Sequence, residues 1–190
     1  MNKQRLEAFS DGVLAIIITI MVLELKVPPG DSLEALAAMR STFLGYVLSF
    51  VYVGIYWNNH HHLLHTVHGV TGGVMWANLH LLFWLSLIPA VTAWADHYPV
   101  SPLPTAFYGV VLLASSLAWL VLQRAIIRAG GSLRRMIGAD LKGKLSPLLY
   151  LTAIALSFVR TWAADAVYAL VAALWFIPDR RIERRSGAGE

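Results

Sequence analysis

Three histidines share one face of a predicted helix. His61, His65 and His68 recur at the spacing i, i+4 and i+7 within the stretch WNNHHHLLHTVHG, residues 57–69. Imidazoles at this spacing can bind zinc or copper, and they can sense pH because histidine changes charge between about pH 5 and 8. No carboxylate or thiolate stands beside them, so the pattern favours a polar helix end with interhelical hydrogen bonds over a metal site.

A second polar group opens the first apolar run. Ser10 and Asp11 stand at its head, and Arg5 precedes them. A carboxylate inside a membrane span costs about 2.5–3.5 kcal/mol at the centre and less near an end, so Asp11 is expected to serve as an ion relay or as a polar contact between helices. Geometry favours the contact, with Ser10 in a buried hydrogen bond. An N-cap of the first helix is the structural alternative for both residues.

The composition places these groups in a membrane protein. Of the 190 residues, 57% are hydrophobic and 14% are charged, with a mean hydropathy of +0.61. A soluble domain is nearer half apolar and about a quarter charged. Cysteine is absent from the sequence, which excludes disulfides and thiolate metal sites. The formal net charge of +4 is assigned to basic cytoplasmic loops, so nucleic acid is not an expected partner.

Six apolar segments predict an all-α integral membrane protein with six transmembrane helices. The predicted spans cover residues 9–25, 42–58, 74–94, 105–123, 145–159 and 162–177. A crossing normally needs about 20 residues, and the last two segments are shorter, with roughly 15 apolar residues each. For the fifth helix an earlier start, near Asp140, is the alternative. The spans form one domain, residues 1–179, followed by a basic tail, residues 180–190.

The basic residues give the spans a direction. Six spans put both termini on one side of the membrane. Of the 15 Lys and Arg residues, all but Lys26, Arg40 and Arg160 fall on that side, which leaves 12. Because basic loops stay in the cytoplasm, both termini are predicted to be cytoplasmic. The basic tail is expected to contact anionic lipid.

The first span has one narrow apolar stripe. At about 100° per residue, Ile16, Ile20 and Leu23 fall within roughly 60° of one another. Thr19 flanks them, whereas Asp11 lies about 140° from Ile16 around the helix. The stripe is interpreted either as a face toward lipid or a neighbouring helix, or as apolar rings that narrow a pore and exclude water. A pore would require a symmetric oligomer, because one helix cannot surround it.

The first helix also has a family signature. Arg5, Phe9, Ser10 and Asp11 form the pattern Arg-x-x-x-Phe-Ser-Asp, followed by GVLAIIITIMVLEL, and the later stretch IYWNNHH matches the end of a second helix. On these motifs the chain resembles the transmembrane protein 175 family, the endosomal–lysosomal potassium channels and their prokaryotic relatives. The resemblance extends over the whole six-helix layout.

The resemblance implies a homotetramer whose first helices line the pore. The family's narrowest points are rings of large aliphatic side chains, which match Ile16, Ile20 and Leu23 here. Thr19 matches a polar position close to the pore. The signature residues are similar to a set that holds the first helix against its neighbours. The implied function is a potassium-selective, leak-like cation channel in the bacterial inner membrane, with no carbonyl filter and no cofactor besides the permeant K⁺.

Other functions have less support in the sequence. An enzyme is not predicted, because GxSxG, HExxH, Walker and dinucleotide-binding motifs are absent. A carbonyl filter of the TVGYG type is absent too. The alternative function is a small secondary transporter or metal-handling membrane protein that uses the histidine run. Asn78 and His80 are expected to face the bundle interior, because lipid exposure of polar groups is unfavourable, and His80 is a further candidate for a polar or pH-sensing network.

Overall fold

The computed structural model describes residues 2–67, 69–130 and 141–176. Within these ranges the regular structure is helical, with no strand, so the predicted all-α class is confirmed. The helices are α1 (Lys3–Leu23), α2 (Leu33–Ala38), α3 (Arg40–His65), α4 (Gly72–Ser86), α5 (Ile88–His97), α6 (Pro102–Arg128), α8 (Leu141–Ser157) and α9 (Thr161–Phe176). The predicted basic tail, residues 180–190, lies outside the described residues.

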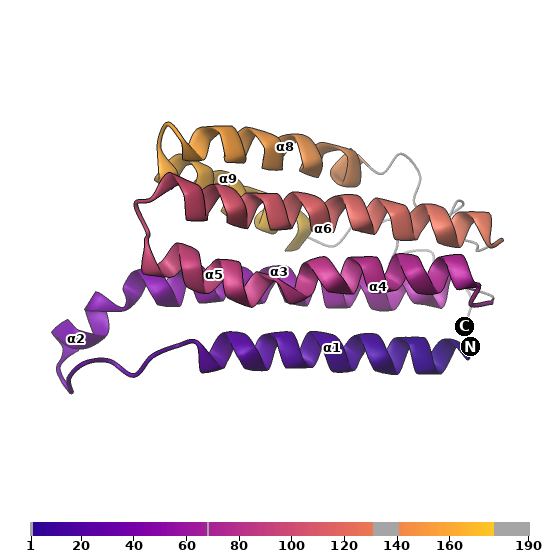
Figure 1. Cartoon of the computed structure of the whole chain (residues 1–190), viewed down its shortest axis with the longest axis horizontal. Helices are drawn as coiled ribbons and strands as arrows, with labels where there is room; N and C mark the ends of the chain where they lie inside the picture. Colours follow the sequence, from indigo (N-terminus) through magenta and orange to yellow (C-terminus); the bar gives the residue numbers. More distant parts are fainter. Residues whose placement is uncertain (1, 68, 131–140, 177–190) are drawn as a thin grey trace.

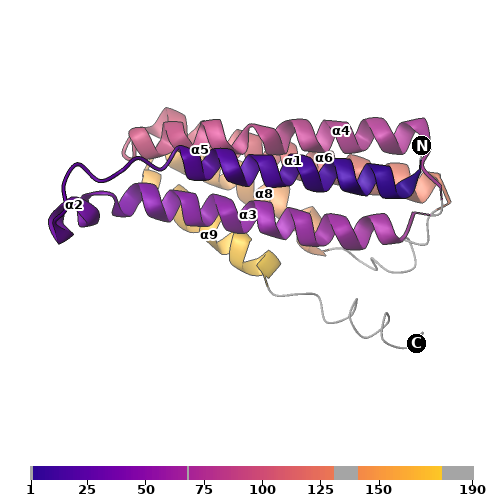
Figure 2. The same cartoon turned by 90° about the horizontal axis from the view of Figure 1, so that it is seen from below.

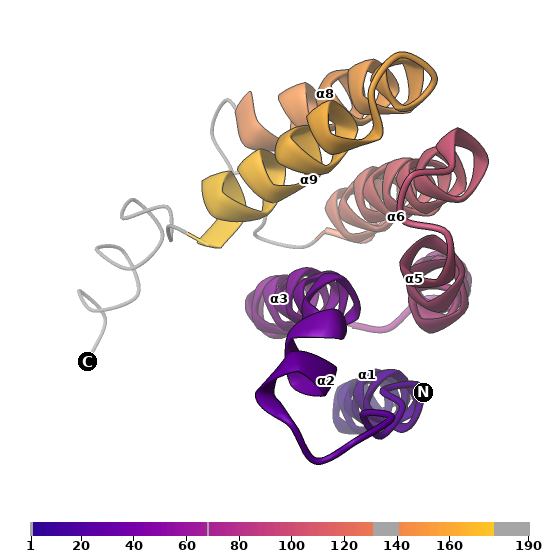
Figure 3. The ribbon, with the colours of Figure 1, turned by 90° about the vertical axis from the view of Figure 1, so that its left-hand side faces the viewer.

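The long helices run side by side along the longest axis of the molecule (Figure 1). α1 lies at one edge of the bundle, where it packs against α3, α4 and α5 (Figures 1 and 2). Seen end-on, α6 stands between the group of α1, α3 and α5 and the pair formed by α8 and α9 (Figure 3). α2 projects at the end opposite the N-terminus, in the connection between α1 and α3 (Figure 1). The edge position of α1 leaves one of its sides open.

Every predicted apolar segment has a helical counterpart, although hydropathy alone selects fewer. Lys3–Leu23, Gly72–His97 and Pro102–Arg128 are long and apolar enough to cross a membrane, and Thr161–Phe176 is apolar but shorter. The chain is therefore a multi-pass membrane protein. The helices α3 and α8 contain the remaining two segments. α3 is less apolar because its second half holds the histidine run, and the 17-residue α8 has Lys142 and Lys144 in its first turn.

The first helix begins at Lys3, earlier than the apolar span that starts at residue 9. Asn2 is its N-cap, and the side-chain oxygen of Asn2 accepts a hydrogen bond of 3.2 Å from the amide of Gln4. Ser10 and Asp11 consequently lie well inside the helix. The alternative that they cap its start is wrong, because capping by Asn2 extends the helix through polar residues that a hydropathy window leaves out.

The third predicted span, residues 74–94, is two helices that meet at Leu87. Pro89 stands at the start of α5. Proline has no amide hydrogen to donate to the carbonyl four residues earlier, and its ring collides with that turn. Pro89 therefore accounts for the break between α4 and α5.

The sequence also did not predict the short helix α2. Ser32 caps this helix by accepting a bond of 3.2 Å from the amide of Ala35.

Hydroxyl groups connect the helices inside the apolar core. Ser49 of α3 lies 2.7 Å from the Thr92 hydroxyl of α5 and 3.0 Å from the Tyr108 hydroxyl of α6. Tyr52 of α3 donates a bond of 2.6 Å to the carbonyl of Tyr168 in α9. Within a membrane such interhelical bonds act together with van der Waals packing to hold helices against one another.

Candidate pore helix and its polar anchor

α1 has one packed face and one open face. On the packed face, Leu14 and Ile17 are each 2% exposed. On the open face, Ile16, Ile20 and Leu23 are 60%, 42% and 76% exposed. We call these three residues the apolar stripe. No helix among the described ranges covers the apolar stripe, so it must meet lipid, another copy of the chain, or a pore.

Thr19 lies beside the apolar stripe and is exposed. Its hydroxyl donates a bond of 2.9 Å to the carbonyl of Ala15, one turn earlier in α1. This local bond occupies the proton of the hydroxyl group. The oxygen keeps its capacity to accept, which leaves a polar group on the otherwise apolar open side of the helix.

Ser10 is the start of a buried hydrogen-bonded chain across three helices. Its hydroxyl donates to the carbonyl of Leu6 over 2.8 Å and accepts from Nδ2 of Asn78 in α4 over 2.9 Å. Oδ1 of Asn78 lies 2.6 Å from Nε2 of His60 in α3. Because Oδ1 can only accept, Nε2 of His60 is the protonated ring nitrogen. The predicted buried bond of Ser10 thus exists, and it reaches α3 through α4.

Asp11 makes the second contact between α1 and α3. Nε1 of Trp57 donates a bond of 3.1 Å to Oδ1 of Asp11, and both side chains are exposed. The geometry agrees with the expected polar contact between helices. We call Ser10, Asp11, Trp57, His60 and Asn78 the polar anchor, because together they hold the first helix against α3 and α4.

Arg5 and Phe9 stand outside the polar anchor. Both are exposed, Phe9 by 53%. The one ion pair in the described part of the chain joins Lys3 to Glu7 over 3.9 Å, so Arg5 has no acidic partner there. The prediction that Arg5 helps to hold the first helix against its neighbours therefore stays untested within a single chain.

The histidine run is only partly assembled. His61 and His65 lie one turn apart on α3, with 3.1 Å between their Nε2 atoms and 4.4 Å between ring centroids. His68, the third member of the predicted face, lies outside the described residues. Across the described ranges, no group of three or more histidine, cysteine, aspartate or glutamate side chains is arranged to hold a metal ion. The pair is a polar helix end, as the sequence indicated.

His80 corrects one expectation from the sequence, and His60 is a residue that the sequence analysis missed. His80 is exposed instead of facing the bundle, and its Nε2 accepts a bond of 3.0 Å from Nε1 of Trp84. The indole of Trp84, one turn further along α4, therefore gives the imidazole of His80 a hydrogen-bond partner at the surface. His60, at 3% exposure, is the buried histidine. Helical spacing could have predicted that His60 is buried. The apolar residues Val53 and Leu64 stand seven positions before it and four after it, so they share its face of the helix, and both are buried.

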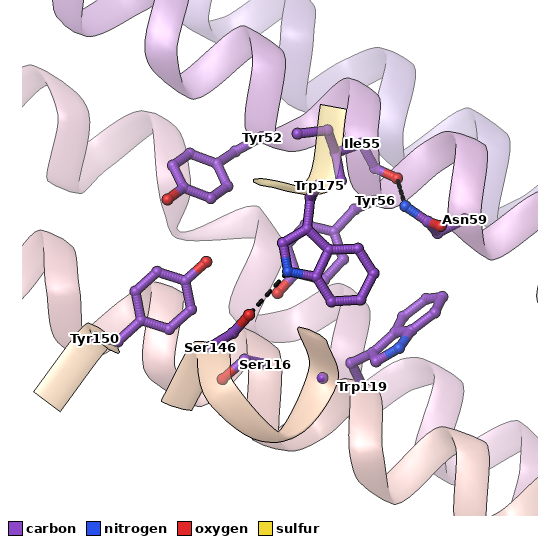
Figure 4. A pocket seen from close by; sticks show the side chains of 10 residues that line it. Tyr52, Ile55, Tyr56, Asn59, Ser116, Trp119, Ser146, Tyr150 and Trp175 are labelled. Carbon is purple, nitrogen blue, oxygen red and sulfur yellow. Dashed lines mark hydrogen bonds between the residues drawn. The ribbon is translucent and has the colours of Figure 1, made fainter. Parts of the chain in front are cut away.

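A small pocket lies on the far side of α3, between α6, α8 and α9 (Figure 4). Aromatic side chains surround it, among them Tyr52, Tyr150 and Trp175. Nε1 of Trp175 donates a bond of 2.8 Å to the hydroxyl of Ser146. The residues of the described ranges that line the pocket are all uncharged. The pocket lies where α8 and α9 pack on the bundle, and none of these lining residues belongs to α1.

Comparisons with known proteins agree with this arrangement. The profile of the family described as endosomal/lysosomal potassium channel TMEM175 matches residues 5–89, which include α1 from its third residue onward and the polar anchor. A potassium channel of Chryseobacterium sp. (strain P1-3) is 52% identical over 187 residues, 97% of each chain. The human endosomal/lysosomal proton channel TMEM175 is 40% identical over 75 residues, 33% of this chain and 15% of the human protein.

A solved structure is similar over almost the full length. The lysosomal potassium-selective channel TMEM175 homolog from Chamaesiphon minutus superimposes with a TM-score of 0.79 at 30% identity, covering 92% of this chain and 96% of that one. The fold is that of a multi-pass membrane channel, and the chain belongs to the TMEM175 family. The resemblance read from residues 5–11 is confirmed. The family consists of ion channels, so the prediction that the chain is not an enzyme is confirmed as well.

Proposed function

We propose that four copies of the chain form a potassium-selective, leak-like channel in the bacterial inner membrane, with the N- and C-termini in the cytoplasm. The first helix of each copy lines the pore. The names of the bacterial relatives, potassium channel and potassium-selective channel, support K⁺ as the permeant ion. Neither a carbonyl filter nor a cofactor takes part in this proposal.

The observation that carries the proposal is the two-sided character of α1. Its inner side is held by packed Leu14 and Ile17 and by the polar anchor, whereas the apolar stripe is open. An unpartnered aliphatic face on a helix at the edge of the bundle fits a fourfold arrangement in which that face meets its own copies around an axis. The opposite orientation, with the apolar stripe toward lipid, would leave the oxygen of the exposed Thr19 hydroxyl beside hydrocarbon.

The apolar stripe would act on ions through dehydration. Rings of Ile16, Ile20 and Leu23 offer no oxygen ligands, so an ion passing them must keep part of its water shell or lose it at a cost. K⁺ holds its water less tightly than Na⁺, which would give a preference for K⁺ that depends on ring diameter. The polar anchor fixes the rotation of α1 and with it the direction in which the ring side chains point.

The test is ion flux from liposomes that contain the purified protein. Ile16→Asn replaces an apolar ring by amides and lowers the dehydration barrier, so we expect faster flux and a lower K⁺ over Na⁺ ratio. A barrier lowered by about 1.4 kcal/mol would raise the flux about tenfold. Leu151→Asn is the matched control, because Leu151 is 52% exposed on α8, away from α1. It should leave flux and ratio unchanged.

Two outcomes would contradict the proposal. An Ile16→Asn channel with the flux and ion ratio of the wild type would remove the apolar stripe from the ion path. No K⁺ flux from folded wild-type protein would contradict leak-like conduction. Proton flux is measured in the same liposomes with a pH-sensitive dye, because the human relative is named a proton channel. Proton flux that exceeds K⁺ flux would replace potassium by protons as the main permeant ion.

A further inference from the structure

A groove lies between the start of α4 and the end of α6, at the end of the bundle where the N-terminus lies (Figure 1). Thr71 and Trp76 line it from the α4 side, and Arg124 and Arg128 line it from α6. It is separate from the apolar stripe and the polar anchor, and ion conduction as proposed above makes no use of it.

The groove holds positive charge without a counter-charge. Arg124 and Arg128 are four residues apart, so their side chains share one face of α6, and both are exposed. Among the described residues that line the groove, none is acidic. Lys3 and Glu7 form the single ion pair found in the described part of the chain, so neither arginine is paired there. Two like charges one helical turn apart repel each other, and an anion between them would remove that repulsion.

The groove also has an apolar part, on the side toward the middle of the bundle. Trp76 is 70% exposed and Val121, the next groove residue toward the middle of α6, is 41% exposed. Tryptophan favours the headgroup level of a bilayer. The surface therefore changes from cationic at Arg128 to apolar at Val121 within two helical turns. A ligand that fits both parts has an anionic head and an apolar tail.

We propose that this groove binds the phosphate headgroup of an anionic phospholipid from the adjacent leaflet. Arg124 and Arg128 hold the phosphate oxygens, because the planar guanidinium group pairs with phosphate through two parallel hydrogen bonds. Trp76 packs beside the headgroup, and the first carbons of an acyl chain follow Val121. Basic clefts between transmembrane helices are a general type of site for anionic lipid heads.

The test is native mass spectrometry of the intact assembly in detergent, titrated with phosphatidylglycerol or with phosphatidylcholine of the same acyl chains. Wild-type protein should bind phosphatidylglycerol more tightly. The pair Arg124→Gln and Arg128→Gln should weaken that binding by roughly ten- to thirtyfold, from about 1 kcal/mol per basic residue. The pair Arg40→Gln and Arg160→Gln removes the same charge at the opposite end of the bundle and should change nothing.

A second variant distinguishes the paired hydrogen bonds of arginine with phosphate from the effect of positive charge alone. Arg124→Lys with Arg128→Lys keeps both charges and is expected to bind phosphatidylglycerol with intermediate affinity. Equal phosphatidylglycerol affinity in the wild type and the glutamine pair would overturn the proposal, as would an equal loss in the Arg40 and Arg160 control. Displacement of the lipid by millimolar inorganic phosphate would also overturn it, because the groove would then take a soluble phosphate compound.

Discussion

Asn78 joins Ser10 of the first helix to His60 of the third, with bonds of 2.9 Å and 2.6 Å from the two ends of one amide. All three side chains are at most 3% exposed. One side chain of α4 therefore satisfies buried polar groups on two other helices at the same time. The packed side of α1 has a fixed partner, and so the direction of the apolar stripe is fixed too.

Replacing Asn78 by leucine should destabilise the protein by about 2–3 kcal/mol. The change keeps the volume but leaves the buried N–H of His60 without an acceptor and removes the donor to Ser10, at about 1–3 kcal/mol for an unsatisfied buried group. Denaturant unfolding in detergent measures the loss. Asn58→Leu, at an exposed position of α3, is the control and should stay within about 0.5 kcal/mol of the wild type. Equal stabilities of the two variants would show that the chain of bonds adds little.

A methyl group at Gly109 should also be costly, by about 1–3 kcal/mol. An added Cβ there would meet the Tyr168 hydroxyl of α9 and Cγ1 of Ile154 in α8, the latter at 2.8 Å. Two separate helices close the space, so neither atom can move away without shifting the packing. Gly54→Ala is the control, because no atom lies within 4 Å of its added Cβ. It should gain about 0.5–1 kcal/mol from lower backbone entropy in the unfolded chain.

The same unfolding measurement can identify the atom responsible. In a Tyr168→Phe background the hydroxyl nearest to the new methyl group is absent, so Gly109→Ala should cost less there than in the wild type. The comparison is made between matched pairs, since Tyr168→Phe also removes a bond of 3.1 Å to the carbonyl of Thr105. An unchanged cost of Gly109→Ala in both backgrounds would place the clash elsewhere.

Asp11 and Trp57 should be energetically coupled by about 1 kcal/mol. Their bond of 3.1 Å involves a carboxylate, which strengthens it, and lies on an exposed surface, which weakens it. A double-mutant cycle with Asp11→Ala and Trp57→Phe, followed by unfolding, measures the coupling. Asp11→Ala combined with Trp162→Phe, at the far end of the bundle, should give a coupling near zero. A coupling of the same size in both cycles would assign the effect to the unfolded state.

Zinc should not stabilise the protein through His61 and His65. Two imidazoles form an incomplete ligand set, because structural zinc sites have four ligands. A site that stabilises the fold would add about 2.7 kcal/mol at a zinc concentration one hundred times its dissociation constant. Thermal unfolding with and without zinc is compared for the wild type and for His61→Gln with His65→Gln. A zinc-dependent shift that the double variant loses would restore the metal-handling alternative.

The amino-acid sequence by itself determined where the long apolar helical segments form and in what order, although not the short helix α2 or the break at Leu87. In a bilayer every backbone polar group needs an internal partner, so a long apolar segment has to be a helix. The segment at residues 105–123 accordingly lies in α6, and all but the last two residues of the segment 9–25 lie in α1. The stripe of Ile16, Ile20 and Leu23 followed from helical geometry too, because side chains three or four residues apart share a face. The ends of the helices were harder to predict from hydropathy. They depend on capping by Asn2 and on the missing amide hydrogen of Pro89, which a hydropathy average does not register.

Only the tertiary structure decided which polar residues are buried and with whom. His60 and His61 are neighbours of the same type, yet one is buried against Asn78 and the other is exposed. They point about 100° apart, and only one of these directions meets α4. The partners of Asn78 lie 18 and 68 residues away in the chain. Hydropathy and spacing are local properties of a sequence, whereas such bonds depend on how distant helices pack.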